Sequence, residues 1–141
     1  MLILEDVLAT YTSISQEKSI LQIIKSVREG INYNAFISIS KHMPFSSSEW
    51  SHFLHVSERT MLRYKNDNLT FDSLQTEKVF QLSMVYDKGL EVFGEKVYLD
   101  IWLNTQNVAL GGLKPKELFD NSFGIGLIQD ELVRIEHGVL A

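Results

Sequence analysis

The segment SSSEWSHFLHVSERTMLRYK, residues 46–65, decides the fold. Apolar residues stand on both sides of His55, at the offsets where two short helices must pack when they cross at about 90–120°. His55 would take the left-handed backbone conformation of the turn, which His, Asn and Asp tolerate better than other residues with a Cβ atom. The segment therefore predicts a helix-turn-helix. Its packing residues are Trp50, Leu54, Val56, Met61 and Tyr64, with the small Ser51 where the second helix passes closest.

The helix ends of this segment support the same prediction. Ser46 and Glu49 have the S-x-x-E spacing of a capping box, which defines the start of the first helix. Ser57 can cap the second helix by accepting a hydrogen bond from an amide in its first turn. The second helix of such a motif enters the major groove of DNA, although two such helices can also form a hairpin that only packs. The predicted DNA-binding residues are Ser57, Arg59, Thr60, Arg63 and Lys65, of which Arg59 and Arg63 are the best candidates for base or phosphate contacts.

Charge is unevenly distributed along the 141 residues, whose formal net charge is −5. Residues 1–40 sum to −1, residues 41–68 to +1 and residues 69–141 to −5. The helix-turn-helix is the only net-positive part, and only slightly, so one copy would make few phosphate contacts and bind DNA weakly. We therefore expect operator DNA to be bound by a homodimer or a larger assembly. The acidic C-terminal part should serve another purpose.

Several protein classes do not fit this sequence. It has no run of about 18 apolar residues for a membrane span, its start MLILEDVLAT lacks the basic region of a secretory signal, and its lack of cysteine fits a reducing cytoplasm. Glu49-x-x-His52 is half of a di-iron motif without a second copy. No coherent set of acid, base or nucleophile is present. We predict a cytoplasmic protein that is not an enzyme and has no metal, cofactor, membrane contact or small-molecule substrate.

The remaining sequence has helical rather than strand periodicity. In the long helix expected over residues 72–93 we place Leu74 on the buried side, and in the next helix Tyr98. Ser122 should cap the last helix, in which Gly124 and Gly126 suit a close packing contact. The predicted helices span residues 17–29, 33–42, 72–93, 95–103, 115–119 and 122–138, in addition to the helix-turn-helix.

This pattern predicts an all-α fold with three parts. An N-terminal arm and helix (residues 1–32) precede a helix-turn-helix domain with a long connecting helix (residues 33–94). A small helical domain (residues 95–141) completes the chain.

Residues 102–138 carry a distinctive spacing of tryptophan, glycine, proline and apolar residues. The segment reads Trp102-Leu103, Ala109-Leu110-Gly111-Gly112, Pro115, Leu118, Gly124, Leu132, Arg134-Ile135 and Gly138. Upstream, Ser57-Glu58-Arg59-Thr60 and Glu91-Val92-Phe93-Gly94 extend the pattern to about residues 30–141. The pattern resembles the Xre/ParS/MbcA-type antitoxins, in which an Xre-like helix-turn-helix bundle is followed by a small helical toxin-binding domain.

The resemblance implies a partner and a mechanism. Such antitoxins are usually encoded with a RES-domain toxin that degrades NAD⁺, and their C-terminal end covers or enters its active-site cleft. In many members the helix-turn-helix represses the shared promoter. Two departures concern DNA binding, because His55 replaces the commoner Gly and the second helix is poor in positive charge. In this chain the toxin-binding residues would be Arg134, Glu136, His137, Gly138, Val139, Leu140 and Ala141.

The end of the last helix is itself compatible with that role. Its mixed charge could occupy a cleft built for a dinucleotide, and an acidic surface complements a basic rim. Alternatively, Arg134 only stabilises the helix C-terminus through the helix dipole. We expect an antitoxin that blocks its toxin sterically. The alternative is a stand-alone helix-turn-helix regulator whose C-terminal domain dimerises.

Overall fold

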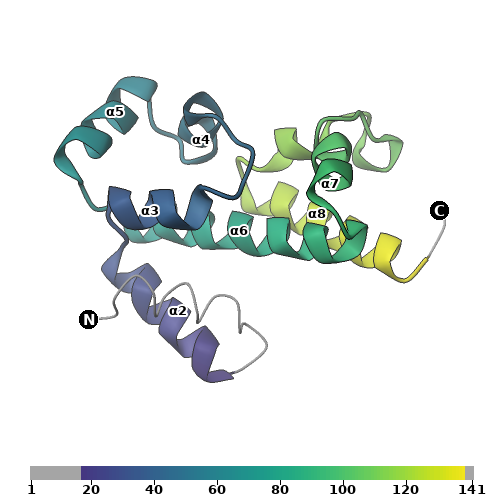
Figure 1. Cartoon of the computed structure of the whole chain (residues 1–141), viewed down its shortest axis with the longest axis horizontal. Coiled ribbons are helices and arrows are strands. Elements are labelled where there is room, and N and C mark those ends of the chain that lie inside the picture. Colours follow the sequence, from purple (N-terminus) through teal and green to yellow (C-terminus); the bar gives the residue numbers. More distant parts are fainter. Residues whose placement is uncertain (1–16, 139–141) are drawn as a thin grey trace. The chain divides into compact units, whose positions relative to one another are not determined.

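The computed structural model describes residues 17–138 and confirms the all-α fold class (Figure 1). Residues 1–16, which hold most of the predicted N-terminal arm, and the predicted contacts of Val139, Leu140 and Ala141 lie outside the described residues. Within residues 17–138 there is no strand, and no helix is long and apolar enough to span a membrane. The helices are α2 (Glu17–Glu29), α3 (Tyr33–Ser40), α4 (Ser47–Phe53), α5 (Glu58–Asp67), α6 (Ser73–Phe93), α7 (Lys96–Leu103) and α8 (Ser122–Glu136), with short 3-10 helices η1 (Val108–Leu110) and η2 (Pro115–Leu118).

The chain divides into two compact units, and the boundary between Phe80 and Gln81 falls inside α6. That helix therefore contributes one stretch of side chains to each unit. The domain limits predicted from the sequence, with a division after residue 94, stay a prediction.

The helix-turn-helix of the first unit forms as predicted. Helix α4 begins with the capping box, in which the Glu49 amide donates to Ser46 Oγ and the Ser46 amide to Glu49 Oε1. His55 has a φ of +57°, so it adopts the left-handed turn conformation. The small Ser51 is buried, as the close approach of the second helix requires. The residues that close the interface from both helices are Trp50, Leu54 and Met61, all buried.

Aromatic rings connect the helix-turn-helix to the rest of its unit. Phe36 of α3 makes edge contacts with Trp50 and Phe71, with ring centroids 5.1 and 5.3 Å apart. The buried Thr76 of α6 accepts a hydrogen bond from the Ile31 amide at 3.1 Å. This bond satisfies a buried backbone group just before α3, a requirement for a stable core.

In the second unit two glycines allow close approaches, Gly89 between α6 and α7 and Gly124 between α8 and η2. A Cβ atom on Gly89 would lie 2.6 Å from Leu99 Cδ1, and one on Gly124 would overlap the carbonyl oxygen of Leu118. The predicted packing role is therefore confirmed for Gly124. It is wrong for Gly126, where an added Cβ would meet nothing within 4 Å.

Three other sequence predictions are wrong in detail. Leu74 is 75% exposed, because it lies on the side of α6 opposite Val79 and Phe80, which the first core buries. Tyr98 is 57% exposed, since α7 turns the adjacent Leu99 inward instead. The cap of α8 is the residue before Ser122: Asn121 is extended, and its side chain accepts from the Gly124 amide at 2.8 Å. In each case the helix itself was predicted correctly. The side that faces the core was wrong for α6 and α7, and the capping residue was wrong for α8.

The contact at Gly124 makes a sharp stability prediction. Gly124→Ala should lower the free energy of unfolding by about 1–3 kcal/mol. The new methyl group would clash with the backbone carbonyl of Leu118, which cannot move aside as a flexible side chain could. Gly126→Ala, in the same helix, should instead raise it by about 0.5–1 kcal/mol through helix propensity. Urea unfolding followed by circular dichroism measures both changes. Equal effects of the two substitutions would contradict the packing role of Gly124.

Candidate functional site

The first candidate surface is the outer side of α5, which the helix cap orients. Ser57 Oγ accepts from the Thr60 amide at 3.0 Å and donates to Thr60 Oγ1 at 2.9 Å. Ser57 thus uses its hydroxyl to define the start of the helix, and Thr60 keeps its own hydroxyl proton for another acceptor. The predicted contact residues Arg59, Arg63 and Lys65 are all exposed, and Thr60 is partly exposed.

The inner side of α5 holds this surface in place. Met61 is buried, and the Tyr64 ring stacks on Phe71 with centroids 4.9 Å apart. The Arg63 guanidinium lies 6.0 Å from the Tyr64 ring centroid, at the outer limit of a cation–π contact. Arg59 and Arg63 are four residues apart, so the helix presents both on one side. Sequence reasoning missed Leu62, which is 54% exposed beside them.

The second candidate surface is the C-terminal end of α8. Arg134 has a 43% exposed side chain and pairs with Glu131 at 3.5 Å. His137 caps the helix and Gly138 follows with a φ of +66°, so the helix ends where the sequence predicted. Both residues are exposed. The structure therefore presents Arg134, His137 and Gly138 to solvent together.

Glu136 faces a different way from these residues. Lys88 Nζ of α6 donates to both carboxylate oxygens of Glu136, at 2.9 and 2.8 Å. The hydrogen bond from Lys88 lowers the pKa of Glu136, and the same bond raises the pKa of Lys88. The two residues are 48 positions apart, so no local sequence signal identified this pair. The pair links the last turn of α8, next to Arg134 and His137, to α6.

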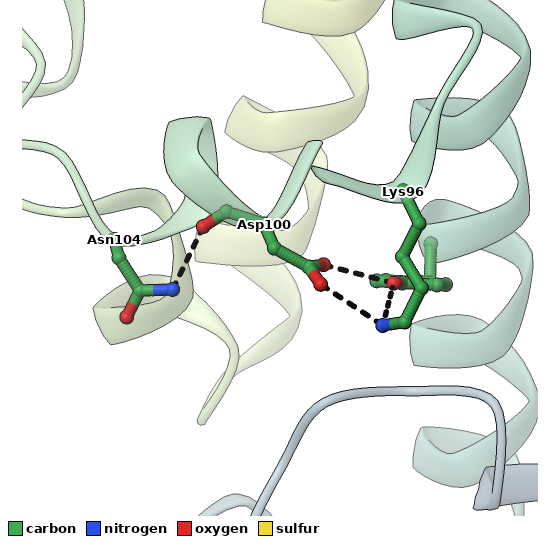
Figure 2. Close-up of polar contacts among 4 residues, drawn as sticks. Lys96, Asp100 and Asn104 are labelled. Carbon is green, nitrogen blue, oxygen red and sulfur yellow. Dashed lines mark hydrogen bonds and ion pairs between the residues drawn. The ribbon is translucent and has the colours of Figure 1, made fainter. Parts of the chain in front are cut away.

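A polar network that sequence reasoning missed joins α6 to α7 (Figure 2). Lys96 Nζ donates to Asp100 Oδ2 at 2.9 Å and to Tyr86 Oη at 2.8 Å, and Tyr86 donates to Asp100 Oδ1 at 2.9 Å. Asn104 Nδ2 donates to the Asp100 carbonyl oxygen at 2.8 Å. Burial is the largest cause of the raised pKa of Tyr86, so its phenol keeps the proton that it donates. The spacing of Lys96, Asp100 and Asn104 by four residues was the available signal.

The outer side of α7 carries a hollow of about 590 Å³. It is lined by Val97 and Ile101 together with Lys96, Asp100 and Asn104. Among the residues that the structure describes, no three His, Asp or Glu side chains form a group that could hold a metal ion.

Two protein-family models match this chain, and each covers one of the two candidate surfaces. Residues 22–83 match the model of the antitoxin Xre-like helix-turn-helix domain. Residues 88–138 match the model of the antitoxin Xre/MbcA/ParS C-terminal toxin-binding domain. The chain belongs to the Xre/MbcA/ParS antitoxin family. The family predicted from the sequence spacing is therefore confirmed.

A relative from Yersinia enterocolitica supports the assignment over most of the chain. It is named Antitoxin Xre and is 22% identical over 120 residues, which are 84% of this chain and 81% of that protein. In this antitoxin the exposed side of α5 lies in the helix-turn-helix match. The end of α8, with Lys88 and Glu136, lies in the toxin-binding match.

The Lys88–Glu136 pair predicts a measurable titration in the antitoxin. The pKa of Glu136 should lie below the ordinary 4.5, and Lys88→Met should return it toward that value. The pair's contribution to stability is complete above pH 4.5 and is lost as the pH falls through the lowered pKa. Carboxyl-carbon NMR measures the pKa, and hydrogen exchange reports fraying of the last turn of α8.

Glu91→Gln is the matched control for this titration. Glu91 lies 3.9 Å from the same Lys88 without the short bond to both carboxylate oxygens. Its substitution should leave the pKa of Glu136 depressed. An ordinary pKa for Glu136 in the unaltered antitoxin would refute the pairing.

Proposed function

We propose that the antitoxin binds and sterically blocks a RES-type, NAD-degrading toxin through its C-terminal domain. The observation that carries this proposal is the end of α8, where the bond of Lys88 to Glu136 at 2.8 Å anchors the helix while Arg134 and His137 stay exposed. This end lies within the residues that match a toxin-binding domain. The RES identity of the toxin is what the family resemblance implies.

In the proposed mechanism the antitoxin acts by occupying space. The exposed end of α8, with Arg134, His137 and Gly138, would enter the mouth of the toxin's cleft. Residues 139–141, an apolar tail, would follow it and exclude NAD⁺. Glu136 would hold the helix end through Lys88 and, being itself exposed, would lie beside the toxin contact. The antitoxin itself would carry out no chemistry and need no cofactor, metal or small-molecule substrate.

We propose in addition that the antitoxin binds operator DNA and represses its own operon. Arg59 and Arg63 would contact bases or phosphates, with Thr60 and Lys65 beside them and Ser57 fixing the helix start. With so few cations on α5, one copy gains little affinity from phosphates, so we propose a homodimer as the DNA-binding form. Both proposed partners place its action in the cytoplasm.

Removal of the last residues tests the blocking mechanism. Deletion of residues 134–141 should abolish protection of cells that express the RES-domain protein encoded beside the antitoxin gene. It should leave the fold intact, because the buried Ile125, Ile128 and Leu132 all precede the cut. Glu91→Gln, which leaves the bond of Lys88 to Glu136 and the end of α8 in place, is the control and should still protect. Protection by the truncated chain would rule out the plug. Persistent toxicity with the unaltered antitoxin would favour a stand-alone regulator.

Charge removal on α5 tests the DNA proposal. Arg59→Ala with Arg63→Ala should weaken operator binding and lower the salt dependence of the binding constant by about 2 in slope if both contact phosphates. Lys25→Ala with Arg28→Ala removes the same charge from the exposed side of α2 and should change little. Titrations at several salt concentrations measure both. Unchanged affinity of the α5 variant would remove this helix from DNA binding.

A further inference from the structure

An exposed stripe runs along α8 from its first turn to its end. Phe123, Leu127, Asp130, Arg134 and His137 are spaced by three or four residues, so they share one side of the helix. All five are exposed, Phe123 at 87% and Leu127 at 52%. The opposite side carries Gly124, Ile125, Ile128 and Leu132, which are buried in the core.

The first half of this stripe is apolar without serving the fold. A phenylalanine that is 87% exposed gains little of the stabilisation that burial would give. Val97 and Ile101 of α7 are exposed at the same spacing, but on α8 the pair includes an aromatic residue and leads past Asp130 to Arg134 and His137. Protein interfaces commonly combine a buried aromatic anchor with a polar rim. The stripe has both parts along a length of about 21 Å. Phe123 and Leu127 form the apolar part, and Asp130, Arg134 and His137 form the polar part.

From this arrangement we infer that Phe123 and Leu127 are the apolar anchor of the toxin interface, while Arg134 and His137 lie at the blocked cleft. This inference rests on the proposed function and adds a second, separate contact to it. The toxin surface would offer an apolar recess for the two side chains, with a basic group opposite Asp130. Affinity would come mainly from the anchor, and inhibition from the helix end.

The occupant that the family match favours for this stripe is a toxin, because all of α8 lies within residues 88–138, which match a toxin-binding domain. A two-fold contact between copies that is centred on Asp130 or Arg134 would place like charges opposite each other, which repel. Pairing of the apolar halves of two copies is the competing arrangement, and cross-linking from position 123 distinguishes the two. The two unlike halves of the stripe suit a partner whose surface changes from apolar to polar.

The outer side of α7 supplies a matched control within the same domain. Val97 and Ile101 are also four residues apart and are 55% and 59% exposed. The same pair of substitutions can therefore be made on each helix. Since all four side chains are largely exposed, circular dichroism and thermal unfolding should match those of the unaltered antitoxin.

The test measures binding of the purified full-length antitoxin to the purified RES-domain protein encoded beside it. Phe123→Ser with Leu127→Ser should raise Kd by about 100-fold, while Val97→Ser with Ile101→Ser should change it by less than about threefold. At saturating concentration the α8 variant should still stop NAD⁺ consumption, because the helix end is intact. If the α8 pair binds within about threefold of the unaltered antitoxin, or if both pairs weaken binding equally, the inference is wrong. If the unaltered antitoxin itself does not bind, the proposed function fails instead.

A cross-linking experiment identifies what covers the stripe. A photoreactive benzoyl-phenylalanine in place of Phe123 should cross-link to the RES-domain protein in the purified complex, and the same group in place of Val97 should not. Mass spectrometry of the product identifies the partner. A cross-link between two antitoxin copies in that complex would overturn the assignment of this surface to the toxin.

Discussion

Burial of helix α6 is the constraint on which the rest of the structure depends. The helix is apolar on more than one side, and such a helix is stable only when other elements cover it. The part of α6 up to Phe80 is buried in the core of the first unit, and the part from Gln81 is buried in the core of the second. Thr76, Val79 and Phe80 belong to the core beneath the helix-turn-helix, and Leu82, Val85 and Tyr86 belong to the core that supports α8. Each candidate surface therefore rests on its own stretch of the same helix.

Polar side chains complete each core by holding a neighbouring element against α6. In the first unit Thr76 satisfies the Ile31 amide. In the second, the part-buried Tyr86 hydroxyl joins Lys96 and Asp100, and at the exposed edge Lys88 pairs with Glu136. Buried polar groups contribute when all of them find partners and cost free energy when they do not. These bonds link segments far apart in the chain, so they position the surfaces as well as stabilise the cores.

The sequence segments that hold the two surfaces have net charges of opposite sign. The helix-turn-helix segment, residues 41–68, has a net charge of +1, whereas residues 69–141 carry −5. Acidic residues close to α5 would repel phosphates. A chain with two proposed partners, one of them DNA, benefits from this separation. On α8 the separation continues at finer scale, because the apolar Phe123 and Leu127 precede the charged end.

Features that depend on neighbouring residues were readable in the sequence alone. The capping box at Ser46, the cap at Ser57 and the left-handed turn at His55 involve contacts within a few positions, so local chemistry determines them. Helix periodicity and glycine positions gave the all-α class, and the spacing of residues 102–138 gave the family. Only the tertiary structure decided which way each helix faces. Leu74 and Tyr98 turn outward, and Glu136 turns toward Lys88, because packing partners distant in the sequence select the buried side. The stripe from Phe123 to His137 was hidden for the same reason: a sequence shows that residues share a side of a helix, but only the packed core shows which side is left to solvent.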